Sequence, residues 1–180
     1  GFYVTAKGAV LTTADAVQGC GRVTVDGAAF DLAFADAAAG VAVLTPRVAL
    51  APMAVAEFQT LTPRPETEVA VAGYPYADAL SAPVMTFGRL AALNGLQGET
   101  DQARLRLTAM AGDAGGPVFD SSGSVIGVLL AAPPRQATAL APLLSEKGFA
   151  PVATTRSGAM AAEDLAQLAR GMAVQVSCWN

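Results

Sequence analysis

The chain has 180 residues, of which 53% are hydrophobic and 14% charged, with a formal net charge of −4. This composition excludes a disordered chain, which needs low hydrophobicity and high net charge, and the length fits one domain or two half-size ones. With 11 Lys and Arg against 15 Asp and Glu, a nucleic-acid binder held by a basic face is also excluded.

Several further classes are excluded by what the sequence lacks. No apolar run reaches the ~18–20 residues of a membrane-spanning helix. There is no histidine, so neither an imidazole base nor an imidazole metal ligand exists. The two cysteines stand alone, at positions 20 and 178, and form no zinc-binding cluster. We therefore expect no metal, no cofactor and no membrane span. Gly1 opens directly into a strand-like run, which predicts that the chain is trimmed from a longer precursor.

Short strands dominate the first 135 residues. Two predicted hairpins turn at Lys7-Gly8 and Asp26-Gly27, and Asp-Gly is a strong signal for a two-residue hairpin turn. Many short strands separated by turn residues indicate a sandwich or barrel. The predicted strands are residues 2–6, 9–13, 22–25, 28–34, 41–44, 68–72, 84–90, 104–108, 118–120 and 125–131.

The last 45 residues have a different pattern. Residues 139–147 predict a short helix, and residues 161–170 predict a clearer one. The second has acidic residues near its start, where they favour the helix dipole, and Gly171 follows as a stop signal. Residues 172–178 alternate apolar and polar side chains, which predicts a terminal strand.

Three segments carry recognisable motifs. Residues 10–17 read Val-Leu-Thr-Thr-Ala-Asp-Ala-Val, residues 36–44 read Asp-Ala-Ala-Ala-Gly-Val-Ala-Val-Leu, and residues 112–118 read Gly-Asp-Ala-Gly-Gly-Pro-Val. In this order they resemble the trypsin-like serine protease family, in its bacterial high-temperature-requirement branch. The resemblance covers residues 1 to about 132, and the third motif is the most specific.

The resemblance assigns the catalytic positions to residues that cannot perform the family's chemistry. Asp15 stands where active relatives have the histidine base, Gly40 where they have the orienting aspartate, and Ala114 where they have the serine nucleophile. Gly112, Asp113 and Ala114 match the loop that forms the oxyanion hole. Because the template needs a nucleophile, a base and a group that orients the base, these three positions are vestigial. We expect no enzymatic activity.

An inactive protease scaffold can still bind a peptide as an added β-strand. By the resemblance, the groove has its edge at Val128, Leu129, Leu130 and Ala131, with Thr108 at the floor of the side-chain pocket. The expected function is that of a pseudoprotease that binds a peptide segment or an envelope protein and acts as a scaffold. The alternatives are a collapsed groove that binds nothing and a hydrolase that uses a different mechanism or site.

Other residues offer weaker chemistry. Asp15 and Asp113 could form an acid/base pair or hold a cation, but no oxygen-rich loop completes such a site. Asp113 is better explained as part of the inherited loop, and Asp15 as a partly solvated substitution. Ser121, Ser122 and Ser124 flank a glycine and are typical of a hairpin turn. Cys20 lacks the histidine partner of a nucleophilic cysteine.

The family fold implies two packed six-stranded antiparallel β-barrels followed by a short helix and strand. The expected division is residues 1–57, residues 66–135, and a tail of residues 136–180 that returns to the first barrel, all within one trypsin-like domain. In that fold Cys20 and Cys178 come together as a disulfide, and the alternative is two separate buried thiols. The disulfide and the resemblance favour a periplasmic or secreted protein.

Overall fold

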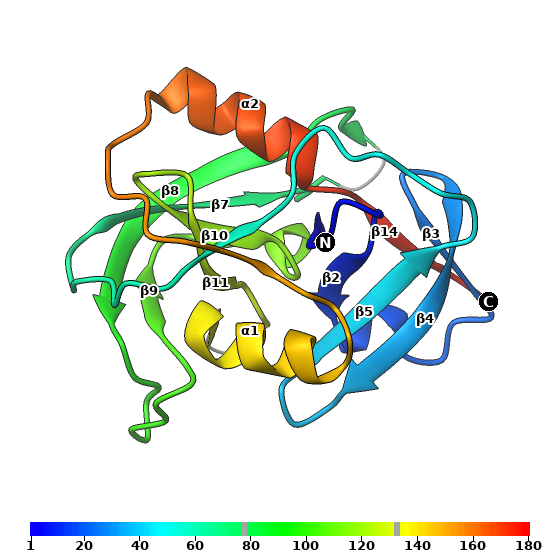
Figure 1. The fold of residues 1–180 in the computed structure, drawn as a ribbon, viewed down its shortest axis with the longest axis horizontal. Helices are drawn as coiled ribbons and strands as arrows, with labels where there is room; N and C mark the ends of the chain where they lie inside the picture. Colours follow the sequence, from blue (N-terminus) through cyan, green and yellow to red (C-terminus); the bar gives the residue numbers. More distant parts are fainter. Residues whose placement is uncertain (77–78, 132–133) are drawn as a thin grey trace.

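The computed structural model describes residues 1–76, 79–131 and 134–180, which form two curled, mainly antiparallel sheets packed side by side (Figure 1). The first sheet has six strands in the order β1-β2-β5-β4-β3-β14, and the second has eight, in the order β13-β6-β11-β10-β7-β8-β9 with β12 paired to β11. The expected all-β, trypsin-like fold is confirmed.

The first sheet contains β1 (Phe2–Tyr3), β2 (Val10–Thr13), β3 (Arg22–Val25), β4 (Ala28–Asp36), β5 (Val41–Pro46) and β14 (Val176–Trp179). The second contains β6 (Glu57–Gln59), β7 (Glu68–Gly73), β8 (Val84–Ala92), β9 (Arg104–Arg106), β10 (Pro117–Asp120), β11 (Val125–Val128), β12 (Arg135–Gln136) and β13 (Val152–Thr154).

The second sheet has eight strands rather than six because short strands extend it. β6 pairs in parallel with β11 through Phe58 and with β13 along its whole length. β6, β12 and β13 are two or three residues long. A segment this short has no readable alternation of apolar and polar side chains, so the sequence did not predict these strands.

The hairpin between β3 and β4 forms at the predicted turn. Asp26 and Gly27 have φ of 46° and 81°, which are the two positive values that a type I′ turn requires. The turn places Val25 opposite Ala28, and the register continues to Val23 opposite Phe30. The local Asp-Gly signal therefore fixes the pairing of the two strands.

Strand β5 is apolar on both of its faces. Val41 and Val43 join the core between the two sheets, whereas Ala42 and Leu44 point into the core of the first sheet. All four side chains are fully buried. Since successive side chains of a strand point in opposite directions, burial on both sides removes the polar alternation of a half-exposed strand. A third core fills the second sheet.

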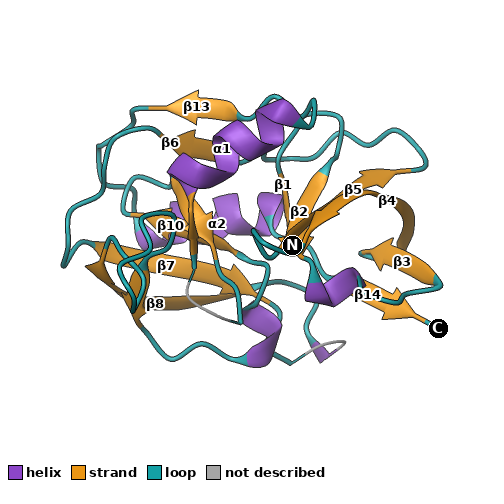
Figure 2. Ribbon diagram, turned by 90° about the horizontal axis from the view of Figure 1, so that it is seen from below, coloured by secondary structure: helices purple, strands orange, loops and turns teal. Residues whose placement is uncertain are grey.

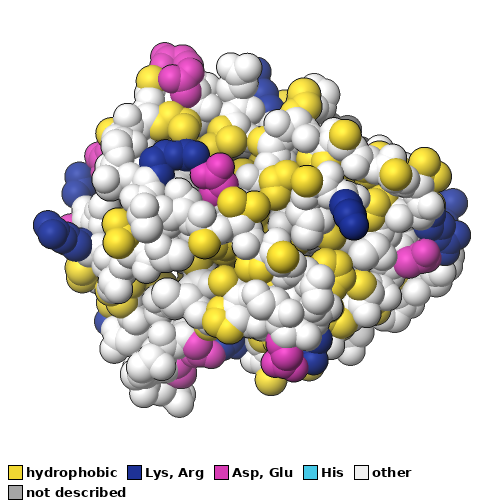
Figure 3. All heavy atoms as spheres, viewed as in Figure 1, with side chains coloured by type: hydrophobic (Ala, Val, Ile, Leu, Met, Phe, Trp, Pro, Cys, Tyr) yellow, Lys and Arg dark blue, Asp and Glu magenta, His cyan; other side chains and the backbone are white. Residues whose placement is uncertain are grey.

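Two helices, α1 (Ala137–Glu146) and α2 (Ala162–Met172), complete the fold. α1 contributes Leu140 and Leu144, and α2 contributes Leu165 and Ala169, to the core between the sheets. Among the described residues, no helix is long and apolar enough to span a membrane. Figure 3 shows that Lys and Arg side chains lie scattered on the face that carries the two helices.

The last strand returns to the first sheet. β14 pairs antiparallel with β3, from Val176 opposite Val25 to Trp179 opposite Arg22. Figure 2 shows the two strands side by side, at the end of the molecule away from β8. The start of the chain lies beside the segment that leads into β14, because Phe2 and Ala173 form an isolated antiparallel β-bridge.

Candidate functional site

The three residues that the resemblance assigns to catalytic positions line one cleft between the sheets. Asp15 begins a single 3-10 turn, η1 (Asp15–Val17), that follows β2, and Gly40 directly precedes β5. Ala114 follows a second 3-10 turn, η3 (Ala111–Asp113). The cleft has a volume of about 600 Å³. Its lining residues are Thr13, Ala14, Asp15, Gln18, Ala35, Ala37, Ala38, Gly40, Gln102, Ala114, Leu130, Ala131 and Arg135.

Gly40 is held in a conformation that suits glycine. Its φ is +72°, and its carbonyl accepts a hydrogen bond of 3.0 Å from the amide of Ala14. A Cβ at this position would lie 3.1 Å from Cδ1 of Leu130. A side chain at position 40 would therefore be strained and would press against an apolar group.

The amides of the loop after η3 are used within the protein. The Ala114 amide donates to the carbonyl of Ala111 at 3.3 Å, and the Gly115 amide donates to Leu129 at 2.7 Å. The Gly116 amide donates to the carbonyl of Asp113 at 3.0 Å. An oxyanion hole needs amide donors aimed at the developing negative charge. In this structure the Ala114 amide already has an acceptor, the Ala111 carbonyl.

Asp113 is buried beside the cleft and does not line it. Its exposed fraction is 0%, and Oδ2 accepts a hydrogen bond of 2.9 Å from the amide of Met110. Within the described chain, Oδ1 has no hydrogen-bond partner. A Cβ on Gly73 would come within 2.5 Å of the Asp113 Cα, so the neighbouring strand packs closely against the loop. Asp113 is thus enclosed, whereas Asp15 is exposed, and the two carboxylates form no pair in the cleft.

Two of the four residues predicted to form the edge of the groove line the cleft. Leu130 and Ala131 line the cleft, but the side chains of Val128 and Leu129 are buried in the cores, with exposed fractions of 0% and 6%. The amide and carbonyl of Leu129 are both bonded to the loop, through Gly116 and Gly115. The part of the expected edge that is available to a ligand therefore starts at Leu130, because the main chain of Leu129 is already hydrogen-bonded to the loop after η3.

Thr108 is not at the floor of this cleft. It lies on the exposed segment that follows β9 and is absent from the cleft lining. The strand predicted over residues 104–108 ends at Arg106, and the chain then leaves the sheet. That early departure carries Thr108 away from the predicted position.

Arg135 is a cleft residue that the sequence did not indicate. Its guanidinium donates to the carbonyls of Ala38 at 2.7 Å and Ala39 at 3.2 Å, and it forms an ion pair with Asp101. The side chain is 11% exposed. It joins the 36–40 loop of the first sheet to the second sheet and fixes one wall of the cleft. Nothing local marks this arginine, because its partners are 34 or more residues away in the chain.

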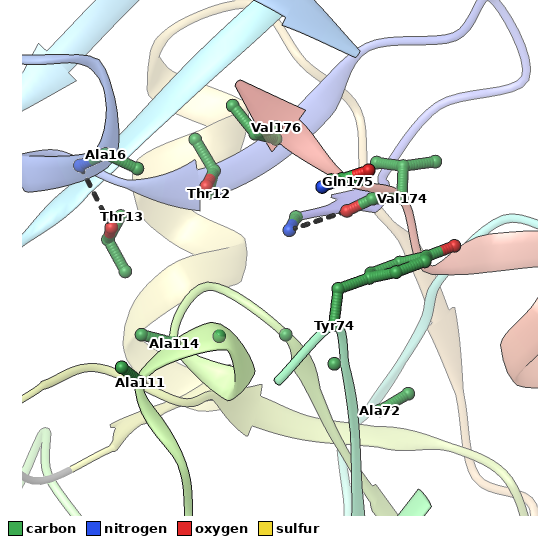
Figure 4. Close-up of a pocket in the computed structure, with 14 residues that line it drawn as sticks. Thr12, Thr13, Ala16, Ala72, Tyr74, Ala111, Ala114, Val174, Gln175 and Val176 are labelled. Atoms are coloured by element: carbon green, nitrogen blue, oxygen red, sulfur yellow. Dashed lines mark hydrogen bonds between the residues drawn. The ribbon is translucent and has the colours of Figure 1, made fainter. Parts of the chain in front are cut away.

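A smaller cavity of about 270 Å³ lies on the other side of the loop (Figure 4). Figure 4 shows Ala114 and Ala111 at one side, Thr12 and Thr13 above them, and the Tyr74 ring opposite. The Gly1 amino group donates to the Val174 carbonyl at 3.1 Å, and burial lowers its pKa to about 5. Burial raises the pKa of Tyr74 to about 12, with a smaller contribution from the charge of Asp26.

The two cysteines form the predicted disulfide. Cys20 and Cys178 are bonded, with their Cα atoms 5.3 Å apart and 158 positions between them in sequence. The bond fastens β14 to the turn that follows η1. Next to it, the indole N–H of Trp179 donates to the hydroxyl of Thr24 at 2.9 Å, and the guanidinium of Arg22 lies 5.2 Å from the centre of the Trp179 ring.

In the part of the chain that the structure describes, no group of three or more Cys, Asp or Glu side chains is arranged to hold a metal ion. The chemistry available in the cleft is therefore that of one exposed carboxylate, two glutamine amides, the hydroxyl of Thr13 and one guanidinium. The Thr13 hydroxyl accepts a hydrogen bond of 3.3 Å from the amide of Ala16.

Solved structures of Rv3671c from M. tuberculosis H37Rv are similar to this chain. A serine-to-alanine mutant in an inactive form has a TM-score of 0.66 and 26% identity, over 82% of this chain and 79% of that one. The Rv3671c protease in an inactive form has a TM-score of 0.65 and 25% identity, over 82% and 83%.

Among curated proteins, the uncharacterized protein y4bJ of Sinorhizobium fredii is 30% identical over 99% of this chain. The chain spans about a third of the length of that relative, 32%. A family model described as a trypsin-like peptidase domain matches residues 1–128. The chain therefore belongs to the family of trypsin-like peptidase domains.

Proposed function

We propose that this protein is a catalytically inactive trypsin-like pseudoprotease, of the high-temperature-requirement-like branch, that binds a peptide segment or a partner protein in the cleft between its two sheets. The observation that carries the proposal is that Asp15, Gly40 and Ala114 line one open cleft and supply no nucleophile, no imidazole and no orienting carboxylate.

The chemistry of the cleft supports the absence of catalysis. Ala114 has no atom that can attack a carbonyl carbon. Asp15 cannot replace the histidine base, because its short carboxylate side chain cannot copy the two-ended hydrogen bonding of imidazole. The bond from the Ala114 amide to the Ala111 carbonyl removes one donor from the oxyanion position. Nucleophile, base and oxyanion stabilisation are weakened together.

The same cleft keeps what a binding module needs. Leu130 and Ala131 follow β11 in the chain and line the cleft. In the described part of the chain, no hydrogen bond uses the main chain of these two residues. Main-chain groups at such an edge can pair with an extended peptide, and neighbouring side chains then select its residues.

We propose a location in the cell envelope. The Cys20–Cys178 bond is compatible with an extracytoplasmic compartment, because disulfides persist in oxidising environments. We propose that the protein acts there as a scaffold or regulator for another envelope protein.

Two measurements test the proposal. The unmodified protein is incubated with casein and with a chromogenic ester, and we expect no turnover above the buffer blank. Binding of fluorescent peptides of about eight residues is followed by anisotropy, and we expect saturable binding that competing unlabelled peptide reverses. As a control, Ala131→Pro removes one main-chain donor from the edge and should weaken binding without unfolding the protein. Robust turnover would contradict inactivity, and absence of all peptide binding would contradict the binding role.

A further inference from the structure

We infer that the segment bound in this cleft carries a basic side chain, lysine or arginine, that pairs with the carboxylate of Asp15. The inference rests on the proposed function, and it specifies the chemistry of the partner at the same site.

The Asp15 carboxylate is available for an external partner. Asp15 is exposed at the start of η1 and lines the cleft. Its backbone carbonyl accepts a hydrogen bond from Gln18, but among the described residues nothing donates to its carboxylate and no cation pairs with it. Its negative charge therefore faces the cleft without compensation from the protein.

The cation at the other side of the cleft, Arg135, is already bonded to groups of the protein itself. Arg135 uses its guanidinium on the carbonyls of Ala38 and Ala39 and on the carboxylate of Asp101. Asp36 lies next to the lining residues Ala35 and Ala37, and one of its carboxylate oxygens accepts a hydrogen bond from the amide of Ala39. Among the described residues that line the cleft, the charged side chains are Asp15 and Arg135, and Arg135 is neutralised by its ion pair with Asp101. The uncompensated charge of the cleft is therefore the Asp15 carboxylate, which favours a positively charged ligand.

The walls suit the long stem of a basic side chain. Six of the lining side chains are alanine methyls, and the side chain of Leu130 adds a larger apolar surface beside Gly40. Lysine and arginine lay their methylene stems along apolar surface while the charged head stays near water or an anion. The lining alanines are Ala14, Ala35, Ala37, Ala38, Ala114 and Ala131, of which Ala14 precedes Asp15 directly.

The expected selectivity is modest. Asp15 is exposed, and pairs between exposed charges are weak and are screened by salt. We expect about a fivefold preference for a basic residue over an uncharged residue of equal length at low salt, falling toward onefold at high salt.

A positional peptide scan tests the inference. The probes are fluorescent octapeptides of alanine, serine and valine with one lysine moved through every position, and a matched set has norleucine in its place. We expect one register in which lysine binds about fivefold more tightly than norleucine. Asp15→Asn should abolish that preference, so that the variant binds the lysine and norleucine peptides of that register equally well. Glu163→Gln, which makes the same charge change in the first turn of α2, should retain it.

The outcomes separate the inference from the function on which it rests. Equal affinities for the two peptide sets, or a lysine preference that survives in Asp15→Asn, would overturn the charge assignment and leave the binding role intact. If no peptide in either set binds, the proposed function and this inference both fail.

Discussion

Cδ1 of Leu130 lies 3.1 Å from the point where a Cβ on Gly40 would stand. Gly40 also has a φ of +72°, so its backbone resists any other residue before side-chain packing is considered. A carboxylate at this position would start from a Cβ that presses against an apolar methyl group. The orienting position of the triad is therefore closed both by backbone conformation and by packing.

Replacing Gly40 should destabilise the protein more than its backbone angle alone explains. We expect Gly40→Ala to lower the free energy of unfolding by about 2–3 kcal/mol, which combines left-handed strain with pressure on Leu130. Urea denaturation followed by circular dichroism measures the loss.

Gly19 supplies the matched control, because its φ is +75° and nothing lies within 4 Å of its Cβ position. Gly19→Ala should cost only about 1–2 kcal/mol. In a double-mutant cycle, Leu130→Ala should remove the extra cost of Gly40→Ala. Equal costs at positions 19 and 40 would refute the role of Leu130.

Rebuilding the catalytic residues should not restore peptidase activity. Ala114→Ser still lacks a base, and triad residues act as a unit, so the single change should give no measurable hydrolysis. We expect the triple change Asp15→His, Gly40→Asp and Ala114→Ser to stay at background too, because the Ala114 amide is bonded to Ala111 and position 40 rejects a side chain.

A fluorogenic peptide and a fluorophosphonate serine probe provide the measurements. The probe distinguishes a serine that is unreactive from one that reacts but cannot turn over substrate. A burst of labelling together with steady hydrolysis by the triple variant would show that the cleft retains a working geometry.

The fold was accessible from the sequence because local signals carry it. The Asp-Gly turn at residues 26–27 sets the β3–β4 pairing, and the glycine-rich motif at residues 112–116 marks the loop beside the cleft. The groove was less accessible. Whether Thr108 lines a pocket depends on where β9 ends. The predicted strand runs to residue 108, whereas the observed strand ends two residues earlier, at Arg106.

Long-range contacts were the least accessible part. Arg135 meets Ala38 and Ala39 across 97 and 96 positions in sequence, and no local pattern encodes that meeting. The same holds for the hydrogen bond from the Ala114 amide to Ala111, because a glycine-rich loop permits several backbone conformations. Sequence therefore marks where the glycine-rich loop lies better than it predicts the hydrogen bonds that the loop makes.

Removing the Arg135 clamp should loosen the wall of the cleft. We expect Arg135→Gln to lower the free energy of unfolding by about 2 kcal/mol, since it removes charge-assisted hydrogen bonds from a side chain that is 11% exposed. Hydrogen exchange of the 36–40 loop should accelerate, because Ala38 and Ala39 lose their contacts with the second sheet.

Arg47 is the matched control. It pairs with Asp31 at 2.7 Å, but both side chains are more than half exposed, at 60% and 57%. Arg47→Gln should therefore cost less than about 1 kcal/mol and leave the exchange of the 36–40 loop unchanged. Equal effects of the two substitutions would show that Arg135 is only another surface cation.

Breaking the disulfide should release β14 from the first sheet. The bond closes a loop of 158 positions, and the chain-entropy model assigns a bridge of this length about 4–5 kcal/mol of stabilisation. The Cys20→Ala/Cys178→Ala double variant should lose an amount of that order in urea denaturation, and reduction of the native protein should give a similar loss.

Trp179 provides a local readout of the same event, because it is the single tryptophan of the chain and stands one residue after Cys178. Its indole bonds Thr24 and its ring contacts Arg22, so both contacts depend on the β3–β14 pairing. On reduction we expect its fluorescence to shift to the red at a lower urea concentration than the loss of the circular dichroism signal, since the end of the chain frays before the cores unfold. The double variant should show the same early shift with or without reductant. Coincident transitions in the reduced protein would mean that strand pairing, and not the disulfide, holds β14 in place.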